Sequence, residues 1–178
     1  MKIHLRSRRV LAATATAVLA AAGIGAAVAP AAPAAAFAAG RCATSGLVVW
    51  LDTNGSGAAG SFYYTLEFTN LSGHTCTLAG YPGVSALSIG GSQLGSPGGR
   101  NNAHPSKTVT LANGATATAV LRLTDVGVFP PSQCRMTTAA GLRVYPPNQT
   151  ASKLIPYPFA ACSRSGTVYL SVESVQKS

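Results

Sequence analysis

Few side chains beyond residue 38 could do acid–base or nucleophilic chemistry. Two histidines occur there, His74 and His104, with four acidic residues at positions 52, 67, 125 and 173. No serine has glycines two residues to each side, as the nucleophile turn of many serine hydrolases requires, and no His-Glu-x-x-His zinc motif is present. We therefore expect no catalytic site, no metal and no cofactor. The alternative is a secreted enzyme or protease inhibitor whose site is assembled from loops.

The segment from Asp52 to Gly57 resembles the first half of a calcium-binding loop, with oxygen-bearing side chains at alternate positions and glycine sixth. The second half does not fit, because position twelve is Tyr63 and a bidentate carboxylate is needed there. Asp, Asn, Gly and Ser are also the residues that tight turns require. We therefore interpret the segment as a hairpin turn between two strands.

The four cysteines are predicted to form two disulfides, since they follow an export leader. Cys134 and Cys162 are equally far from Asn148, so a hairpin turning there brings them within the short distance that a disulfide needs. Cys42 and Cys76 then pair around the first two strands. Each bond is expected to contribute about 3 to 4 kcal/mol. The alternative, a redox or metal role, lacks Cys-x-x-Cys spacing.

Two groups of side chains are candidates for a binding surface. Residues 90–106 are rich in Gly, Ser, Asn and Pro, so we expect a mobile loop that is either a plain connection or a contact surface using Arg100 and His104. The second group would suit a sugar or a partner protein, although tyrosines also cover the outer faces of sandwiches for structural reasons. It lies on the polar side of the predicted strands and comprises Tyr63, Arg143, Tyr145 and Tyr169.

The N-terminal residues predict an export signal. Residues 1–9 carry four bases and no acid, residues 10–29 are apolar and uncharged, and a small-residue cleavage site follows at 36–38. We expect a signal peptide over residues 1–38, cleaved before Ala39, and a single secreted domain over residues 39–178. A retained membrane anchor is the alternative. The arginine pair at positions 8 and 9 leaves both the general and the twin-arginine export routes open.

Charge and compartment limit the partners. Cleavage would lower the net charge from +9 to +5, leaving nine basic residues scattered singly along the chain. Nucleic-acid-binding proteins gather such residues into a stripe or patch, so we expect no nucleic-acid partner. We also expect no stable membrane insertion after cleavage, and a protein that is secreted, extracellular or loosely associated with the cell wall. The candidate partners are a cell-wall polymer or another extracellular protein.

The elements that must position these residues are strands, because apolar residues recur with a period of two. Within residues 61–70, the side chains predicted to face the core are Phe62, Tyr64, Leu66 and Phe68. Residues 115–123 alternate in the same way, and Asn113-Gly114 before them predicts a hairpin that pairs this segment with residues 108–111.

A strand that is expected to be fully buried is predicted at residues 47–51. Further strands are predicted at residues 77–80, 84–89, 142–145, 153–156 and 167–173. In the last of these, Val168, Leu170 and Val172 are expected to point inward. The proline pairs at 130–131 and 146–147 mark loops or edges. Eight or nine short strands indicate an all-β fold, an antiparallel β-sandwich with immunoglobulin-like Greek-key topology and two disulfides.

Several strings together resemble the actinobacterial secreted domain of unknown function numbered 4232. The most specific string runs Cys76-Thr-Leu-Ala-Gly-Tyr-Pro-Gly-Val84; the others are Phe68-Thr-Asn70, the run from Val109 through Gly114, and the placing of the four cysteines. Many members have proline where this chain has Asn113, a departure that changes the turn and not the fold. The resemblance implies an exported β-sandwich with no assigned substrate. With the residue inventory above, it favours a non-enzymatic binding or interaction module at the cell envelope.

Overall fold

The computed structural model describes residues 39–178, which form an all-β structure with two short 3₁₀ turns. The predicted signal peptide, residues 1–38, lies outside the described residues. Between residues 39 and 178 no helix is long and apolar enough to cross a membrane. The strands are β1 Leu47–Ala58, β2 Ser61–Asn70, β3 Cys76–Ala79, β4 Gly83–Leu87, β5 Gln93–Leu94, β6 Gly99–Asn101, β7 Thr108–Leu111, β8 Thr116–Thr124, β9 Met136–Tyr145, β10 Lys153–Cys162, β11 Leu170–Glu173 and β12 Gln176–Lys177.

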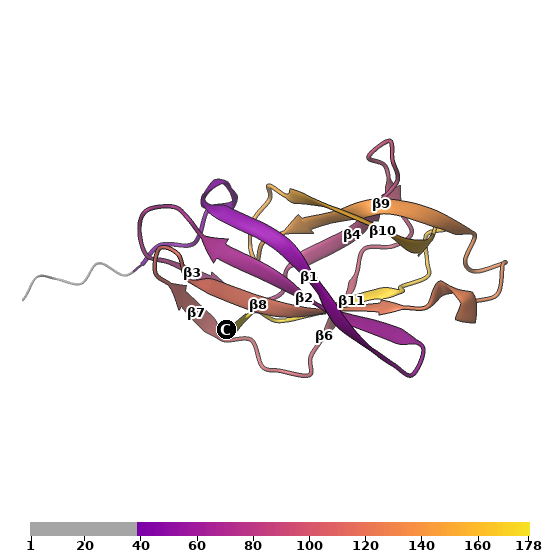
Figure 1. Ribbon diagram of the computed structural model, residues 1–178, viewed down its shortest axis with the longest axis horizontal. Helices are drawn as coiled ribbons and strands as arrows, with labels where there is room; N and C mark the ends of the chain where they lie inside the picture. The colour runs from indigo at the N-terminus through magenta and orange to yellow at the C-terminus, as the bar shows by residue number, and fades with distance from the viewer. Residues whose placement is uncertain (1–38) are drawn as a thin grey trace, which may run out of the picture. The chain divides into compact units, whose positions relative to one another are not determined.

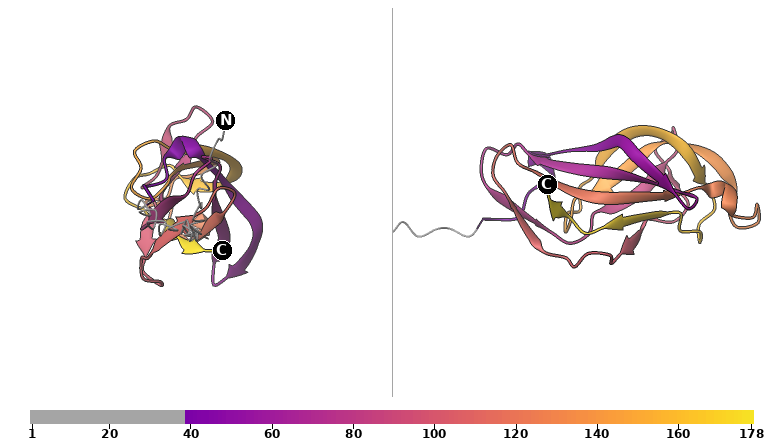
Figure 2. Two further views of the ribbon diagram at one scale, coloured as in Figure 1. Left: turned by 90° about the vertical axis from the view of Figure 1, so that its left-hand side faces the viewer. Right: turned by 60° about the horizontal axis from the view of Figure 1, so that its bottom comes forward.

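Two sheets face each other, with β4, β9 and β10 in one layer and β1, β2, β8 and β11 in the other (Figures 1 and 2). The larger sheet has the order β1-β2-β8-β11-β6, and β12 also pairs with β8; the smaller has the order β10-β9-β4-β5. A separate two-stranded sheet joins β3 to β7. Every pair of these strands is antiparallel except β11 with β6. The predicted antiparallel sandwich is confirmed.

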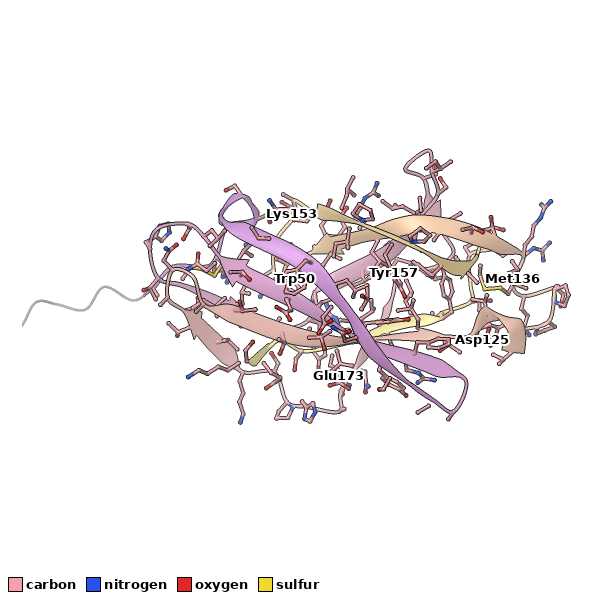
Figure 3. All side chains as sticks on the ribbon, in the orientation of Figure 1. Trp50, Asp125, Met136, Lys153, Tyr157 and Glu173 are labelled. Carbon is pink, nitrogen blue, oxygen red and sulfur yellow. A yellow bond between two sulfur atoms is a disulfide. The ribbon has the colours of Figure 1, made fainter. Side chains whose placement is uncertain are left out.

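The core between the sheets follows from the period-two pattern. In β8 the buried positions are Ala117, Ala119, Leu121 and Leu123, as predicted, and their intervening neighbours are partly exposed. In β2 the prediction holds for Leu66 and Phe68, which are fully buried. An edge-on contact between Tyr64 of β2 and Tyr157 of β10 connects the two sheets, with ring centroids 5.4 Å apart. Figure 3 labels Tyr157.

The first hairpin differs from its prediction in three respects. β1 is an edge strand and only half buried, since Val48 and Trp50 are 46% and 47% exposed. It continues through Asp52–Gly57 to Ala58 with a register shift, so this segment is a bulged strand, and the turn lies at Ala59-Gly60. Phe62, opposite Gly57, is 51% exposed because this part of the hairpin extends past the core.

The predicted pairing of residues 108–111 with 115–123 is wrong. β7 pairs with β3, whereas β8 pairs with β2, β11 and β12. The turn at Asn113-Gly114 does form, with Ala115 N–H donating to Ala112 O, and Gly114 has a φ of +84°. However, Gly114 N–H also donates to Asn70 O at the end of β2. The turn therefore carries the chain from one sheet to another, and the period-two pattern cannot distinguish this from a hairpin.

Residues 90–106 are not one structureless loop. They contain β5, which pairs with β4, and β6, which lies parallel to β11 and contributes the edge of the larger sheet. Both strands are too short for an alternation pattern, and their side chains are mainly polar. The sequence therefore gave no signal for them.

The disulfides join Cys42 to Cys76 and Cys134 to Cys162, the pairs that the hairpin argument favoured. Asn148 lies in the turn between β9 and β10, as that argument requires, and has a φ of +58°. Proline is tolerated within β10 at positions 156 and 158 because this strand is an edge.

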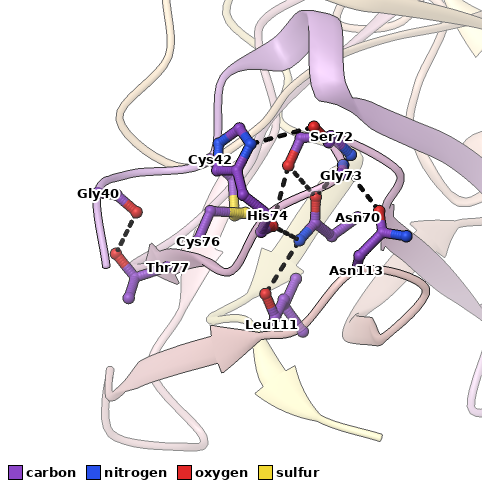
Figure 4. The surroundings of a disulfide bond; sticks show 10 residues. All are labelled: Gly40, Cys42, Asn70, Ser72, Gly73, His74, Cys76, Thr77, Leu111 and Asn113. Atoms are coloured by element: carbon purple, nitrogen blue, oxygen red, sulfur yellow. Dashed lines mark hydrogen bonds between the residues drawn. A yellow bond between two sulfur atoms is a disulfide. The ribbon is translucent and has the colours of Figure 1, made fainter. Parts of the chain in front are cut away.

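A buried amide organises the loop before Cys76 (Figure 4). Asn70 is fully buried; its Nδ2 donates to the carbonyls of His74 and Leu111, at 2.8 and 3.0 Å, and its Oδ1 accepts from the Ser72 backbone and hydroxyl. Because every polar atom of this side chain is used, the network fixes the loop that leads into β3.

Candidate functional site

A polar surface pocket of about 490 Å³ lies where three segments distant in sequence meet. The first connects β3 to β4 at residues 79–83, the second is β6 with the residues after it, and the third is the end of β9 with the turn after it, residues 145–149. The side chains that could contact a ligand there are those of Tyr81, Arg100, Ser106, Tyr145, Asn148 and Gln149. We call this site the Tyr81–Arg100 pocket.

The first segment contains two glycines with different backbone environments. Gly80 has a φ of +103°, a conformation that side chains rarely adopt, and its carbonyl accepts from Val175 N–H. Gly83 is opposite Tyr145 in the β4–β9 ladder, and a Cβ there would lie 3.4 Å from that of Tyr145. A side chain at Gly83 would therefore make ordinary van der Waals contact with Tyr145.

Tyr81 and Arg100 form the centre of the pocket. The Arg100 guanidinium carbon lies 5.5 Å from the centroid of the Tyr81 ring, a cation–π contact. The Tyr81 hydroxyl donates to Asn102 Oδ1 at 2.9 Å, which connects the ring to the residues after β6. No carboxylate among residues 39–178 lies within ion-pair distance of Arg100. No described carboxylate therefore pairs with the Arg100 guanidinium.

The turn at Asn148 closes the opposite wall. Asn148 Nδ2 donates to Ala79 O at 2.8 Å, which joins the β9–β10 turn to the end of β3. Gln149 N–H donates to Pro146 O within the same turn. Asparagine tolerates a positive φ better than other non-glycine residues because its short amide bonds to nearby backbone. The backbone of this wall is therefore fixed before any ligand arrives.

Of the six predicted binding residues, the structure brings Arg100 and Tyr145 together. Arg143 lies on β9 outside the pocket and donates to Gly91 O at 3.1 Å. Tyr63 lies on β2, opposite Arg122, in the other sheet. Neither of these two residues lines the pocket.

The prediction for Tyr169 was wrong. Tyr169 is 1% exposed and Val168 is 53% exposed, so the expected inward and outward sides are exchanged at this point. β11 begins only at Leu170, and the strand alternation does not extend to the residues before it. The Tyr169 hydroxyl donates to Leu94 O at 3.2 Å, and burial raises the pKa of the phenol to about 12.

Sequence reasoning missed Tyr81, Asn148 and Gln149 as pocket residues. Tyr81 belongs to the string from Cys76 to Val84, whose tight Gly-Tyr-Pro-Gly run was a usable signal because it places an aromatic side chain on a turn. Asn148 was identified only as a hairpin centre. Nothing in the sequence around Gln149 indicated that it lines a pocket.

The residues suited to acid–base chemistry do not converge on a nucleophile. His104 Nε2 lies 3.6 Å from Glu173 Oε2, and the His104 side chain is 61% exposed. The buried Ser174 hydroxyl nearby donates to the His104 backbone carbonyl, not to its ring. His74 Nδ1 faces Ser72 O at 3.0 Å in the loop of Figure 4. In the part of the chain described here, no group of three or more His, Cys, Asp and Glu residues is arranged to hold a metal.

A second depression, of about 280 Å³, lies on the smaller sheet between residues 87–91 and 154–156. It is mainly apolar, and two of its residues, Ile89 and Leu154, are 96% and 66% exposed. It lacks the convergent polar groups that orient a specific small ligand. The Tyr81–Arg100 pocket is therefore the stronger candidate.

Comparison with known proteins identifies a family. The family model described as a domain of unknown function, DUF4232, matches residues 42–176. No curated protein matches the chain, and no solved structure does. The matched range contains both disulfides and every residue that lines the Tyr81–Arg100 pocket. The chain belongs to the DUF4232 family of domains of unknown function.

Proposed function

We propose that the protein is an exported, non-catalytic binding module of the cell envelope that holds a saccharide in the Tyr81–Arg100 pocket. The observation that carries the proposal is the convergence of two tyrosines, an arginine and two amide side chains on one concave surface. Aromatic faces pack against the C–H faces of sugars, while phenol, amide and guanidinium groups exchange hydrogen bonds with hydroxyls.

Export belongs to the same proposal. The charged and apolar leader predicts secretion, and two disulfides suit an oxidising compartment outside the cytoplasm. The string from Cys76 to Val84 favours an actinobacterial source, as in the family that it resembles. We place the protein in the medium or loosely on the cell wall, where a wall polymer is the ligand within reach.

Binding is tested with the full chain, expressed with its leader and purified from the culture medium. N-terminal sequencing of the released form checks cleavage before Ala39. Calorimetric titration against a panel of wall fragments and polysaccharides should show saturable binding to at least one. Chromatography of the same mixtures should show the saccharide unchanged.

Tyr145→Ala should weaken that binding about tenfold, because it removes one of the two aromatic faces. Tyr63→Ala is the matched control, since that tyrosine lies on β2 opposite Arg122 and outside the pocket. Equal losses in both variants would contradict the assignment of the pocket. Hydrolysis that disappears in His104→Ala would instead establish an enzyme, and stoichiometric loss of activity in a panel of secreted proteases would establish an inhibitor.

A further inference from the structure

We infer that the ligand of the Tyr81–Arg100 pocket is anionic, a saccharide that presents a carboxylate or phosphate group to Arg100. This inference rests on the proposed function and names the chemical class of the ligand. It follows from the charges around the pocket, from the way Arg100 is held, and from the hydrogen-bonding groups that remain unused beside it.

No acidic residue among residues 39–178 neutralises Arg100. Asp52 accepts from the backbone and side chain of Asn54, and Asp125 accepts from Gly127 N–H. Glu173 faces His104 and accepts from Asn101 Nδ2. The fourth acid, Glu67, lies in β2 between β1 and β8. None of the four lines the pocket, so the Arg100 charge has no partner within this part of the protein.

The charge of Arg100 is also held in place. Its guanidinium lies over the Tyr81 ring, and the Tyr81 hydroxyl is bonded to Asn102 two residues beyond Arg100. A guanidinium against an aromatic face still presents its N–H edge, whose geometry matches the two oxygens of a carboxylate or phosphate. A preorganised donor of this kind loses less conformational entropy on binding than a free arginine side chain.

The neighbouring groups favour an anion attached to a sugar. Ser106, Tyr145 and Gln149 line the pocket, and their side chains make no hydrogen bond to another described residue. They can bond to sugar hydroxyls or to the remaining anion oxygen. A separate depression contains two further positive charges, those of Lys107, which follows Ser106 in the sequence, and Lys177.

The test compares two probes that differ only in charge: a trimer of galacturonic acid and the methyl ester of the same trimer. The full chain should bind the acid at least tenfold more tightly than the ester in calorimetric or NMR titrations. Arg100→Gln should abolish this difference, while Arg100→Lys should retain only part of it, because lysine lacks the bidentate edge. Raising the salt concentration should weaken binding of the acid and leave the ester unaffected.

The matched control is Arg135→Gln. It removes the same charge from an exposed arginine just before β9, whereas Tyr145 is the last residue of that strand, roughly 30 Å away for a strand of this length. Arg135→Gln should keep the tenfold preference for the acid. Glucose 1-phosphate and inorganic phosphate, titrated in parallel, distinguish the sources: a phosphate-bearing wall polymer is indicated if the sugar phosphate binds more tightly than the trimer acid.

The test distinguishes failure of the anionic-ligand inference from failure of the pocket assignment. Equal affinity for acid and ester, with both lost in Tyr145→Ala, would leave the saccharide site standing and overturn the anionic ligand. A preference for the acid that survives Arg100→Gln would also overturn it. If neither trimer nor phosphate shifts the amide signals of residues 79–83 and 145–149, both the anionic ligand and the pocket assignment are wrong.

Discussion

Raising the pH from 8 to about 11.5 should destabilise the protein through Tyr169, and Tyr169→Phe should remove that effect. Tyr169 is 1% exposed, and burial raises the pKa of its phenol from 10.0 to about 12. The unfolded chain therefore loses this proton first. The stability that Tyr169 contributes is complete below pH 10 and disappears as the pH rises toward 12.

The size of the effect follows from the two pKa values. Each unit of difference corresponds to about 1.4 kcal/mol, so the shift is worth up to about 3 kcal/mol, of which about 2 kcal/mol is lost by pH 11.5. Tyr157, whose pKa burial also raises to about 12, adds to the alkaline loss in both proteins and cancels in the comparison.

The assay is denaturant unfolding of the oxidised wild type and of Tyr169→Phe at a series of pH values. At pH 8 the phenylalanine variant should be about 1 kcal/mol less stable, because Leu94 O loses its donor. By pH 11.5 the order should reverse. Two free-energy curves that stay parallel from pH 8 to 11.5 would refute the reasoning, since they would mean that Tyr169 titrates alike in the folded and unfolded states.

Three further variants test the framework of the fold. Replacing Cys134 and Cys162 together by alanine should lower the free energy of unfolding by about 3.6 kcal/mol, from the separation of 28 residues, as measured by denaturant unfolding. Asn70→Ala should cost about 3 kcal/mol by the same measurement, because buried carbonyls lose their donor. Gly141→Ala should lower the melting temperature, with a loss of about 2 kcal/mol, since a Cβ there would overlap the carbonyl oxygen of Ile155.

Local alternation was sufficient to predict the sandwich. The pattern in β8 identified every buried position because that strand is central and pairs on both sides. The same reasoning failed for Phe62, which belongs to a hairpin at the edge of the sheet. An apolar side chain there repeats with the correct period, but no second layer covers it. Trp50 in the same hairpin was predicted to be buried because residues 47–51 were interpreted as one continuous buried run, whereas burial alternates there. The alternation shows on which face of a strand a side chain lies, but not whether a second sheet covers that face.

The pocket was harder to predict because its residues come together only through the topology. Arg100 and Tyr145 are separated by 45 positions, and neither flanking sequence indicates that β6 and the end of β9 meet. β6 joins the sheet by parallel pairing with β11, and its three residues are too few to show alternation. A site built from strand ends and turns therefore leaves little local trace in the sequence.

Within the string from Cys76 to Val84, most residues have structural roles, whereas Tyr81 has the proposed binding role. Cys76 and Leu78 are core residues, Gly80 adopts a positive φ, and Gly83 pairs with Tyr145 in the β4–β9 ladder. Tyr81 has no comparable role in the core: it is only partly buried, and its contacts are with Arg100 and Asn102 across the pocket. The backbone conformation of this turn requires glycine at position 80 and does not depend on the Tyr81 phenol. The phenol is therefore explained by what it holds, the guanidinium of Arg100, which we propose binds the ligand.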